Sequence, residues 1–232
     1  MSRVKPVKPV KPVKPVNPFK PPTAIKMAVR TAVILFLFVA VFTTLLSAAY
    51  LRTLPTIEAA AAEEKMKLID DVLPRDSYDN TLLSDSIQLA PSPALGLADA
   101  STAYRARRGG KVSAVVLEAT APDGYAGAIR LLIAVAADGT LIGVRVTQHK
   151  ETPGLGDYIE PKKDKNKQHP WITQFAGQRA SADDERQWKV KKDGGHFDSV
   201  AGATVTPRAI VKAVRKAVLY VEAHHETLFA SK

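Results

Sequence analysis

An uncharged segment of 21 residues, Thr31–Leu51, is the feature that most restricts how this chain can fold. At a rise of about 1.5 Å per residue, a helix of this length spans the roughly 30 Å hydrocarbon core of a bilayer. The sequence therefore predicts a transmembrane helix over 31–51. A cleaved signal peptide is the competing interpretation, because Ser47-Ala48-Ala49 resembles a cleavage site. The segment is, however, longer than the roughly 7–15 apolar residues of such peptides.

Positive charge is concentrated before this segment. Residues 1–30 hold eight Lys and Arg side chains and no acid, so they account for most of the net charge of +10. A basic flank of this kind keeps its end of a membrane helix in the cytoplasm. We therefore expect a cytoplasmic N-terminus, with the bulk of the chain beyond the membrane. No nucleic-acid-binding motif is recognisable, so nucleic acid is not an expected partner.

The composition divides the chain into four parts. Residues 1–30 are a basic tail that repeats Val-Lys-Pro over 4–18, a pattern that favours an extended polyproline II spacer. Residues 31–51 are the predicted membrane helix. Residues 52–100 begin with a helix over 56–73, rich in Ala, Glu and Lys and stopped at Pro74, and continue as a polar linker. Residues 101–232 are the expected folded domain.

The pattern of apolar runs and turns in the last part indicates an antiparallel sheet. Asp138-Gly139 between two apolar runs is a strong hairpin signal. The expected fold class is α+β: one N-terminal transmembrane helix, then a single extracytoplasmic domain of antiparallel sheet with helices packed against it. The expected strands are 103–107, 111–120, 129–136, 141–147 and 187–192, and the expected C-terminal helix is 206–228.

The composition also excludes several kinds of chemistry. Cysteine is absent, which rules out disulfides, thiolate-ligated iron–sulfur clusters and thiol nucleophiles. The five histidines show no metal-ligand spacing, so no metal site is expected. A glycine-rich nucleotide-binding motif is also missing. Any redox chemistry must then come from a cofactor held through other atoms.

The most informative candidate site is the segment Asp198–Pro207, which reads Asp-Ser-Val-Ala-Gly-Ala-Thr-Val-Thr-Pro. Thr206 is a good N-cap and Pro207 a good first residue for the helix expected after it. Thr204 then lies just before a helix N-terminus, where unpaired backbone N–H groups favour a phosphate. Gly202 lets the backbone approach a ligand closely. The alternative is an ordinary capped helix that follows a turn of small residues.

A second segment, residues 149–159, reads His-Lys-Glu-Thr-Pro-Gly-Leu-Gly-Asp-Tyr-Ile. Together with Ala201-Gly202-Ala203-Thr204, it resembles the FMN-binding domain of the RnfG (RsxG) family of the Rnf electron-transport complex. The NqrC component of the sodium-pumping NADH–quinone reductase is a relative of that family. The resemblance covers roughly residues 24–225, and Ala201 departs from the Ser or Thr usual there. Further matches are Pro170-Trp171-Ile172, Phe175-Ala176-Gly177, Val190-Lys191-Lys192-Asp193-Gly194-Gly195 and Phe197-Asp198.

The resemblance implies a covalent flavoprotein of the bacterial inner membrane. In that family a separate, magnesium-dependent flavin transferase esterifies FMN through its phosphate to the last Thr of the motif, here Thr204. It also implies electron transfer within an ion-translocating ferredoxin/NADH redox complex, with other membrane and redox subunits and the lipid bilayer as partners. The main domain would be periplasmic. Beside Thr204, the expected FMN-binding residues are Glu151, Thr152, Leu155, Gly156, Lys192, Ser199, Gly202, Ala203 and Thr206.

Other interpretations stay open on the residues themselves. The chain could be an NqrC-like component of a sodium-pumping reductase, a tethered flavin reductase with its own substrate, or a scaffold without redox function. No acid–base constellation stands out, which favours an electron carrier over a reductase. Trp171, Trp188 and Phe197 are expected in the core rather than against a flavin ring. Lys191 or Lys192 could offset phosphate charge, and alternation along a strand would point only one of them inward.

Overall fold

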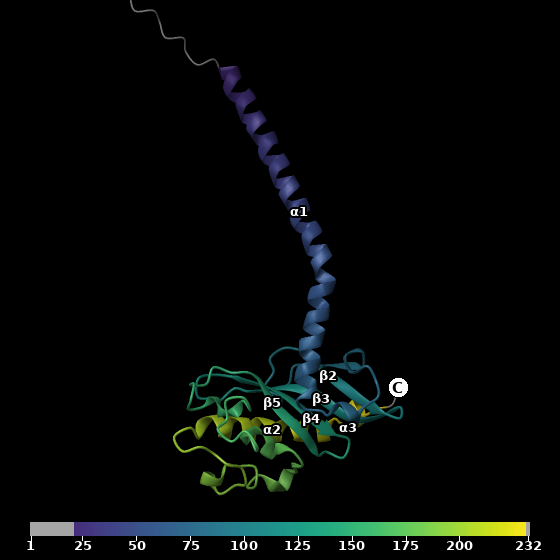
Figure 1. Cartoon of the computed structure of the whole chain (residues 1–232), viewed down its shortest axis with the longest axis vertical. Helices are drawn as coiled ribbons and strands as arrows, with labels where there is room; N and C mark the ends of the chain where they lie inside the picture. The colour runs from purple at the N-terminus through teal and green to yellow at the C-terminus, as the bar shows by residue number, and fades with distance from the viewer. Residues whose placement is uncertain (1–20, 231–232) are drawn as a thin grey trace, which may run out of the picture. The chain divides into compact units, whose positions relative to one another are not determined.

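One long helix, α1 (Pro21–Asp70), begins the part of the chain that the computed structural model describes, residues 21–230 (Figure 1). The basic repeat over 4–18 lies outside the described residues. The chain falls into two units, of which the first ends at Glu58 and the second begins at Ala59. The second unit therefore starts well before residue 101, where the sequence placed the domain.

The part of α1 in the first unit presents its apolar side chains to the outside. Large hydrophobic residues from Ile25 to Ile57 are exposed, and the most apolar 18-residue window of Ala24–Asp70 has a mean hydropathy of 2.5 with none of it buried. Such a surface is disfavoured in water and matches a lipid environment. Among the described residues this is the one helix long and apolar enough to cross a membrane, which confirms the predicted apolar helix.

Pro55 does not separate two helices, as the sequence had suggested. The helices predicted over 31–51 and 56–73 are one, because α1 runs through Pro55 to Asp70. A proline inside a helix removes one N–H donor, but the hydrogen bonds of the turns on either side persist. Thr53 Oγ1 adds hydrogen bonds to the carbonyl oxygens of Ala49 and Tyr50, at 3.0 and 3.2 Å. The prediction of a break was wrong because it weighed one residue against a strongly helical context.

Five antiparallel strands form a sheet in which each strand pairs with its neighbours in sequence. Four of them confirm predicted strands, with bounds that differ by no more than two residues. The strands are β1 (Ser86–Leu89), β2 (Ser101–Arg108), β3 (Lys111–Ala121), β4 (Ile129–Ala136) and β5 (Leu141–Gln148). The predicted hairpin at Asp138-Gly139 joins β4 to β5, and Gly139 has a φ of +83°. β1 was not predicted, since it lies in the segment that read as linker.

The two faces of the sheet bury different partners. One face packs against the helix α2 (Val205–Ala223), and Ile133 of β4 and Val214 of α2 are both fully buried there. The opposite face packs against the end of α1 and the turn after it, including Ile69 and Leu73. At Gly143 of β5 an added Cβ would come within 2.5 Å of the Val72 carbonyl oxygen, so this approach requires glycine.

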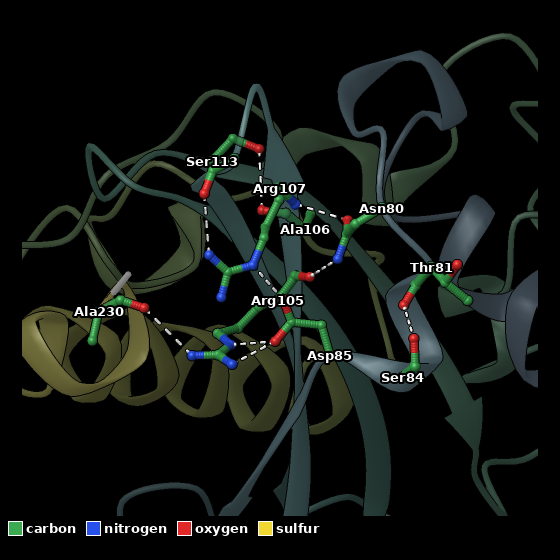
Figure 2. Close-up of polar contacts among 10 residues, drawn as sticks. Asn80, Thr81, Ser84, Asp85, Arg105, Ala106, Arg107, Ser113 and Ala230 are labelled. Carbon is green, nitrogen blue, oxygen red and sulfur yellow. Dashed lines mark hydrogen bonds and ion pairs between the residues drawn. The ribbon is translucent and has the colours of Figure 1, made fainter. Parts of the chain in front are cut away.

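A buried charge cluster fastens residues 79–86 to β2 (Figure 2). Arg105 Nε lies 2.7 Å from Asp85 Oδ1, and Arg107 Nε donates to the other oxygen of Asp85. Asn80 bridges the same strand through the Arg105 carbonyl and the Arg107 N–H, at 3.0 and 2.9 Å. Burial alone raises the pKa of Asp85, but the hydrogen bonds from Arg107 and Arg105 outweigh it and hold that pKa below 3.8. The segment predicted as linker is therefore part of the folded unit.

The strand predicted over 187–192 is wrong. Val190 makes one isolated parallel bridge with Phe197, and the chain then forms a short 3-10 helix. Trp188 and Val190 alternate with polar residues because both are buried against the aromatic core, which imitates a strand pattern. The C-terminal helix predicted over 206–228 is α2, interrupted at His224 and followed by α3 (His225–Leu228). The 3-10 helices are Arg75–Ser77, Leu82–Ser84, Asp157–Ile159, Trp171–Phe175, Ala182–Asp184 and Lys191–Asp193.

Candidate functional site

A cavity of about 110 Å³ lies at the N-terminus of α2. It brings together the two segments that the sequence singled out, although about fifty residues separate them. Of the predicted site residues, Glu151, Thr152, Leu155, Gly156, Gly202, Ala203 and Thr206 line it, joined by Tyr125 and Val205.

The loop over 149–156 leaves the end of β5 and turns sharply at Pro153-Gly154. Gly154 has a φ of +74°, a left-handed conformation that favours glycine, and its N–H donates to Asp157 Oδ1 at 2.7 Å. Gly156 has an ordinary φ of −106°, but an added Cβ would come within 2.9 Å of Glu151 Oε2. The first glycine is therefore required by conformation and the second by space.

Glu151 points into the wall of the cavity and is only 4% exposed. Its Oε1 accepts the backbone N–H of Ala126 at 3.0 Å, and its Oε2 accepts the Thr206 hydroxyl at 2.5 Å. A buried carboxylate needs such donors to offset its lost hydration. The Glu151–Thr206 contact thus joins the loop after β5 to the first turn of α2.

Thr204, not Thr206, occupies the N-cap position of α2. The expectation that Thr206 caps the helix is wrong, because the helix begins at Val205 and the Thr206 hydroxyl is bound to Glu151. Thr204 is 9% exposed, and its hydroxyl makes no hydrogen bond with any described residue. Its neighbours Ala203 and Val205 line the cavity, while Thr204 itself does not.

Backbone donors at this helix end are also free. Within residues 21–230, the N–H groups of Thr204, Val205 and Thr206 have no hydrogen-bond acceptor, and Pro207 has no N–H. Unpaired N–H groups and the helix dipole together favour an anion at this position. Gly202, with a φ of +85°, shapes the turn that leads into the helix.

Aromatic residues beneath the turn hold it in place. Tyr158 donates its hydroxyl to the Ala203 carbonyl at 3.4 Å, and Trp171 donates Nε1–H to the Asp198 carbonyl at 2.7 Å. Burial raises the pKa of Tyr158 to about 12, so its hydroxyl keeps the proton that it donates. Trp171, Trp188 and Phe197 are all buried and lie outside the cavity wall, which confirms their predicted place in the core.

Two predicted site residues lie elsewhere. Lys192 is exposed on the 3-10 helix Lys191–Asp193, so the strand alternation used to choose between the two lysines does not apply. Lys191 pairs with Asp198 at 2.6 Å. Ser199 is half-buried in the turn and does not line the cavity.

Sequence reasoning missed Tyr125, which is 68% exposed at the rim of the cavity. It lies in the connection between β3 and β4, far from both motifs. An aromatic residue in a polar turn was the only local signal, since its place beside residues 151–156 depends on the fold. Val205 was missed for a simpler reason, because the helix was expected to begin one residue later.

Comparison with known proteins agrees with this location. Residues 124–219 match the model of the FMN-binding domain, a range that includes every residue of the cavity wall. The crystal structure of Shewanella oneidensis NqrC is 24% identical, with a TM-score of 0.45 over 69% of this chain and 76% of that one.

Full-length relatives are closer in sequence. Proteins named as the G subunit of an ion-translocating oxidoreductase complex are similar to most of this chain. The Pseudomonas aeruginosa protein is 46% identical over 201 residues, which cover 87% of this chain and 92% of that protein. The Escherichia coli O157:H7 protein is 47% identical over 84% of this chain and 91% of its own length. The Shewanella oneidensis protein is 40% identical over 87% and 93%. The chain therefore belongs to the RnfG family, the G subunits of ion-translocating oxidoreductase complexes, and contains an FMN-binding domain.

Proposed function

We propose that this chain is a membrane-anchored electron carrier that holds FMN through a phosphoester at Thr204, as the RnfG component of an Rnf-type ion-translocating complex. The observation that carries the proposal is the meeting of residues 151–156 with the N-terminus of α2 in one cavity. Each segment alone is compatible with an ordinary loop or a capped helix. Together they make a site with an anion-binding end and a buried carboxylate.

The residues present fit the phosphate of FMN. Three backbone N–H groups at the start of α2 have no acceptor among the described residues, which is the arrangement that binds phosphate at helix N-termini. Of the two threonines there, Thr206 already donates its hydroxyl to Glu151. Thr204 has a hydroxyl without a partner within residues 21–230, so it is the better acceptor for a phosphoester.

The cavity also fits a carrier better than an enzyme with an enclosed substrate. Sites that enclose a small molecule usually measure about 300–1,000 Å³, and this one measures about 110 Å³. FMN would therefore be only partly enclosed, which leaves it accessible to a redox partner. When bound, FMN supplies a ring that accepts and donates electrons singly or in pairs. The chain's own residues hold the phosphate, position the loop and place a buried negative charge beside the site.

Membrane attachment completes the proposal. The apolar helix anchors the domain, and the eight cations of residues 1–30 favour a cytoplasmic N-terminus with the domain in the periplasm. The relatives' name describes a complex, so we expect other membrane and redox subunits as partners and a flavin transferase for maturation. Covalent attachment suits this role, because a reduced cofactor that dissociated would carry its electrons away from the complex.

Denaturing-gel fluorescence of the full chain, co-expressed with a flavin transferase, tests the attachment. We expect a fluorescent band for the wild type and none for Thr204→Ala, because the acceptor oxygen is gone. Ser199→Ala is the matched control, since it removes a hydroxyl five residues away that does not line the cavity, and it should stay fluorescent. A fluorescent Thr204→Ala band, or a wild type without flavin, would contradict the proposal.

A further inference from the structure

His149 does not line the cavity, yet it joins the two ends of the loop that does. Its Nδ1 lies 3.0 Å from the backbone N of Glu151, and its Nε2 lies 2.5 Å from Glu160 Oε1. Glu160 directly follows the 3-10 helix Asp157–Ile159, at the far end of the loop. The His149 side chain is 7% exposed, so both contacts are largely shielded from water.

The two contacts assign the proton of the imidazole ring. A backbone N–H can only donate, so Nδ1 accepts from Glu151, and the hydrogen of the neutral ring is on Nε2, facing Glu160. Lys163 Nζ lies 3.1 Å from the same oxygen of Glu160. Burial alone raises the pKa of Glu160, but its contacts with His149 and Lys163 outweigh burial and hold that pKa below its usual value. An ionised Glu160 therefore fixes the ring in this tautomer.

This arrangement is not a proton path to the cavity. The contact from His149 reaches the backbone N–H of Glu151, not its carboxylate. The carboxylate oxygens accept from the Ala126 N–H and the Thr206 hydroxyl. Since a proton cannot pass from the ring to the carboxylate along a peptide N–H, the geometry suits the positioning of Glu151.

We propose that His149 is a positioning residue of the flavin site, which fixes the Glu151 peptide through Nδ1 and so sets where the Glu151 carboxylate meets Thr206. The contact from a side chain to the N–H two residues on is that of an Asx turn, in which an Asn Oδ1 takes the place of Nδ1. The loop contact rests on the geometry alone, and its consequence for FMN rests on the proposed function.

Two substitutions separate the two contacts of the ring. His149→Asn keeps an acceptor at the position of Nδ1 and loses the reach to Glu160. His149→Gln keeps the reach to Glu160 and loses the acceptor for the Glu151 N–H. The same two substitutions at His169, which is exposed on the segment after Glu160, are the matched controls.

Amide hydrogen exchange of residues 150–156 is measured on the full chain expressed without a flavin transferase. We expect His149→Gln to speed exchange in this loop about tenfold, a factor that corresponds to about 1.4 kcal/mol, the loss expected for one buried hydrogen bond. His149→Asn should stay within about twofold of wild type, and the His169 variants should not change. In the flavin-loaded chain, His149→Gln should shift the flavin absorption spectrum and midpoint potential, and His149→Asn should restore both.

The outcomes separate the inference from the proposed function. Exchange that is unchanged in His149→Gln overturns the positioning role. Exchange that rises equally in His149→Asn and His149→Gln also overturns it, since the ring would then matter through its bulk or through Glu160. Fast exchange in His149→Gln alone supports the positioning role even if the wild type takes up no flavin, a result that would refute the proposed function instead.

Discussion

Replacing Gly156 by alanine tests whether the cavity depends on the contact between Glu151 and Thr206. The φ of Gly156 suits any residue, so the substitution adds no backbone strain. Its Cβ would lie 2.9 Å from Glu151 Oε2 and 3.3 Å from Thr206 Oγ1, so the carboxylate must move away from the hydroxyl. A hydrogen bond to a charged group contributes about 1.5–3 kcal/mol. We expect the free energy of unfolding to fall by about that amount.

A double-mutant cycle shows whether this reason is correct. If Gly156→Ala acts by breaking the Glu151–Thr206 bond, its cost should shrink in a Thr206→Val background, where the bond is already absent. Gly154→Ala is the control, because nothing lies within 4 Å of its Cβ and its cost of about 1–2 kcal/mol comes from the positive φ. Its effect should be the same in both backgrounds.

Urea unfolding of the full chain in detergent, followed by tryptophan fluorescence, measures these free energies. Trp171 and Trp188 are both buried in the domain and report its unfolding. Gly156→Val should cost more than Gly156→Ala, by about a further 1–3 kcal/mol of overpacking, and should also reduce flavin attachment. An equal cost of Gly156→Ala with and without the Thr206 hydroxyl would refute the steric argument.

Three further predictions concern attachment, acid stability and topology. Thr204→Ser keeps a hydroxyl at the helix start and should retain some covalent flavin, and a dark band beside a fluorescent wild type would contradict this. Because the pKa of Asp85 is lowered on folding, its stabilisation is present above about pH 4 and is lost as pH falls through the lowered value. Asp85→Asn should therefore reduce the free energy of unfolding at pH 7 by about 1.5–3 kcal/mol, with the difference from wild type narrowing in acid titrations. A periplasmic reporter fused after Lys232 should be active, whereas a mature N-terminus near Tyr50 would show a cleaved signal peptide.

Strands could be predicted where the local pattern and the tertiary environment agree. β3 and β4 are long apolar runs bounded by turn residues, and both are central strands of the sheet. β1 escaped prediction because its four residues pair only with β2, and nothing in the polar segment before residue 100 shows that pairing. The Asp85 cluster was missed for the same reason, since its partners lie on another strand.

The candidate site shows the same division. The loop and the helix start could be found as motifs, because glycine, proline and threonine have strong local preferences. The N-cap was placed on Thr206 by those preferences, whereas Glu151, 55 residues earlier, binds that hydroxyl. Tyr125 and His149 act through contacts across the fold, which a pass along the chain does not reveal.

Peptide mass spectrometry of the flavin-loaded chain tests the central claim most directly. Trypsin cleaves after Lys192 and Arg208, and the peptide between them contains three hydroxyl side chains, those of Ser199, Thr204 and Thr206. The account predicts the mass of FMN less one water on this peptide, with fragment ions that place it on Thr204. Flavin on Thr206 or Ser199, or an unmodified peptide after co-expression with a flavin transferase, would contradict it.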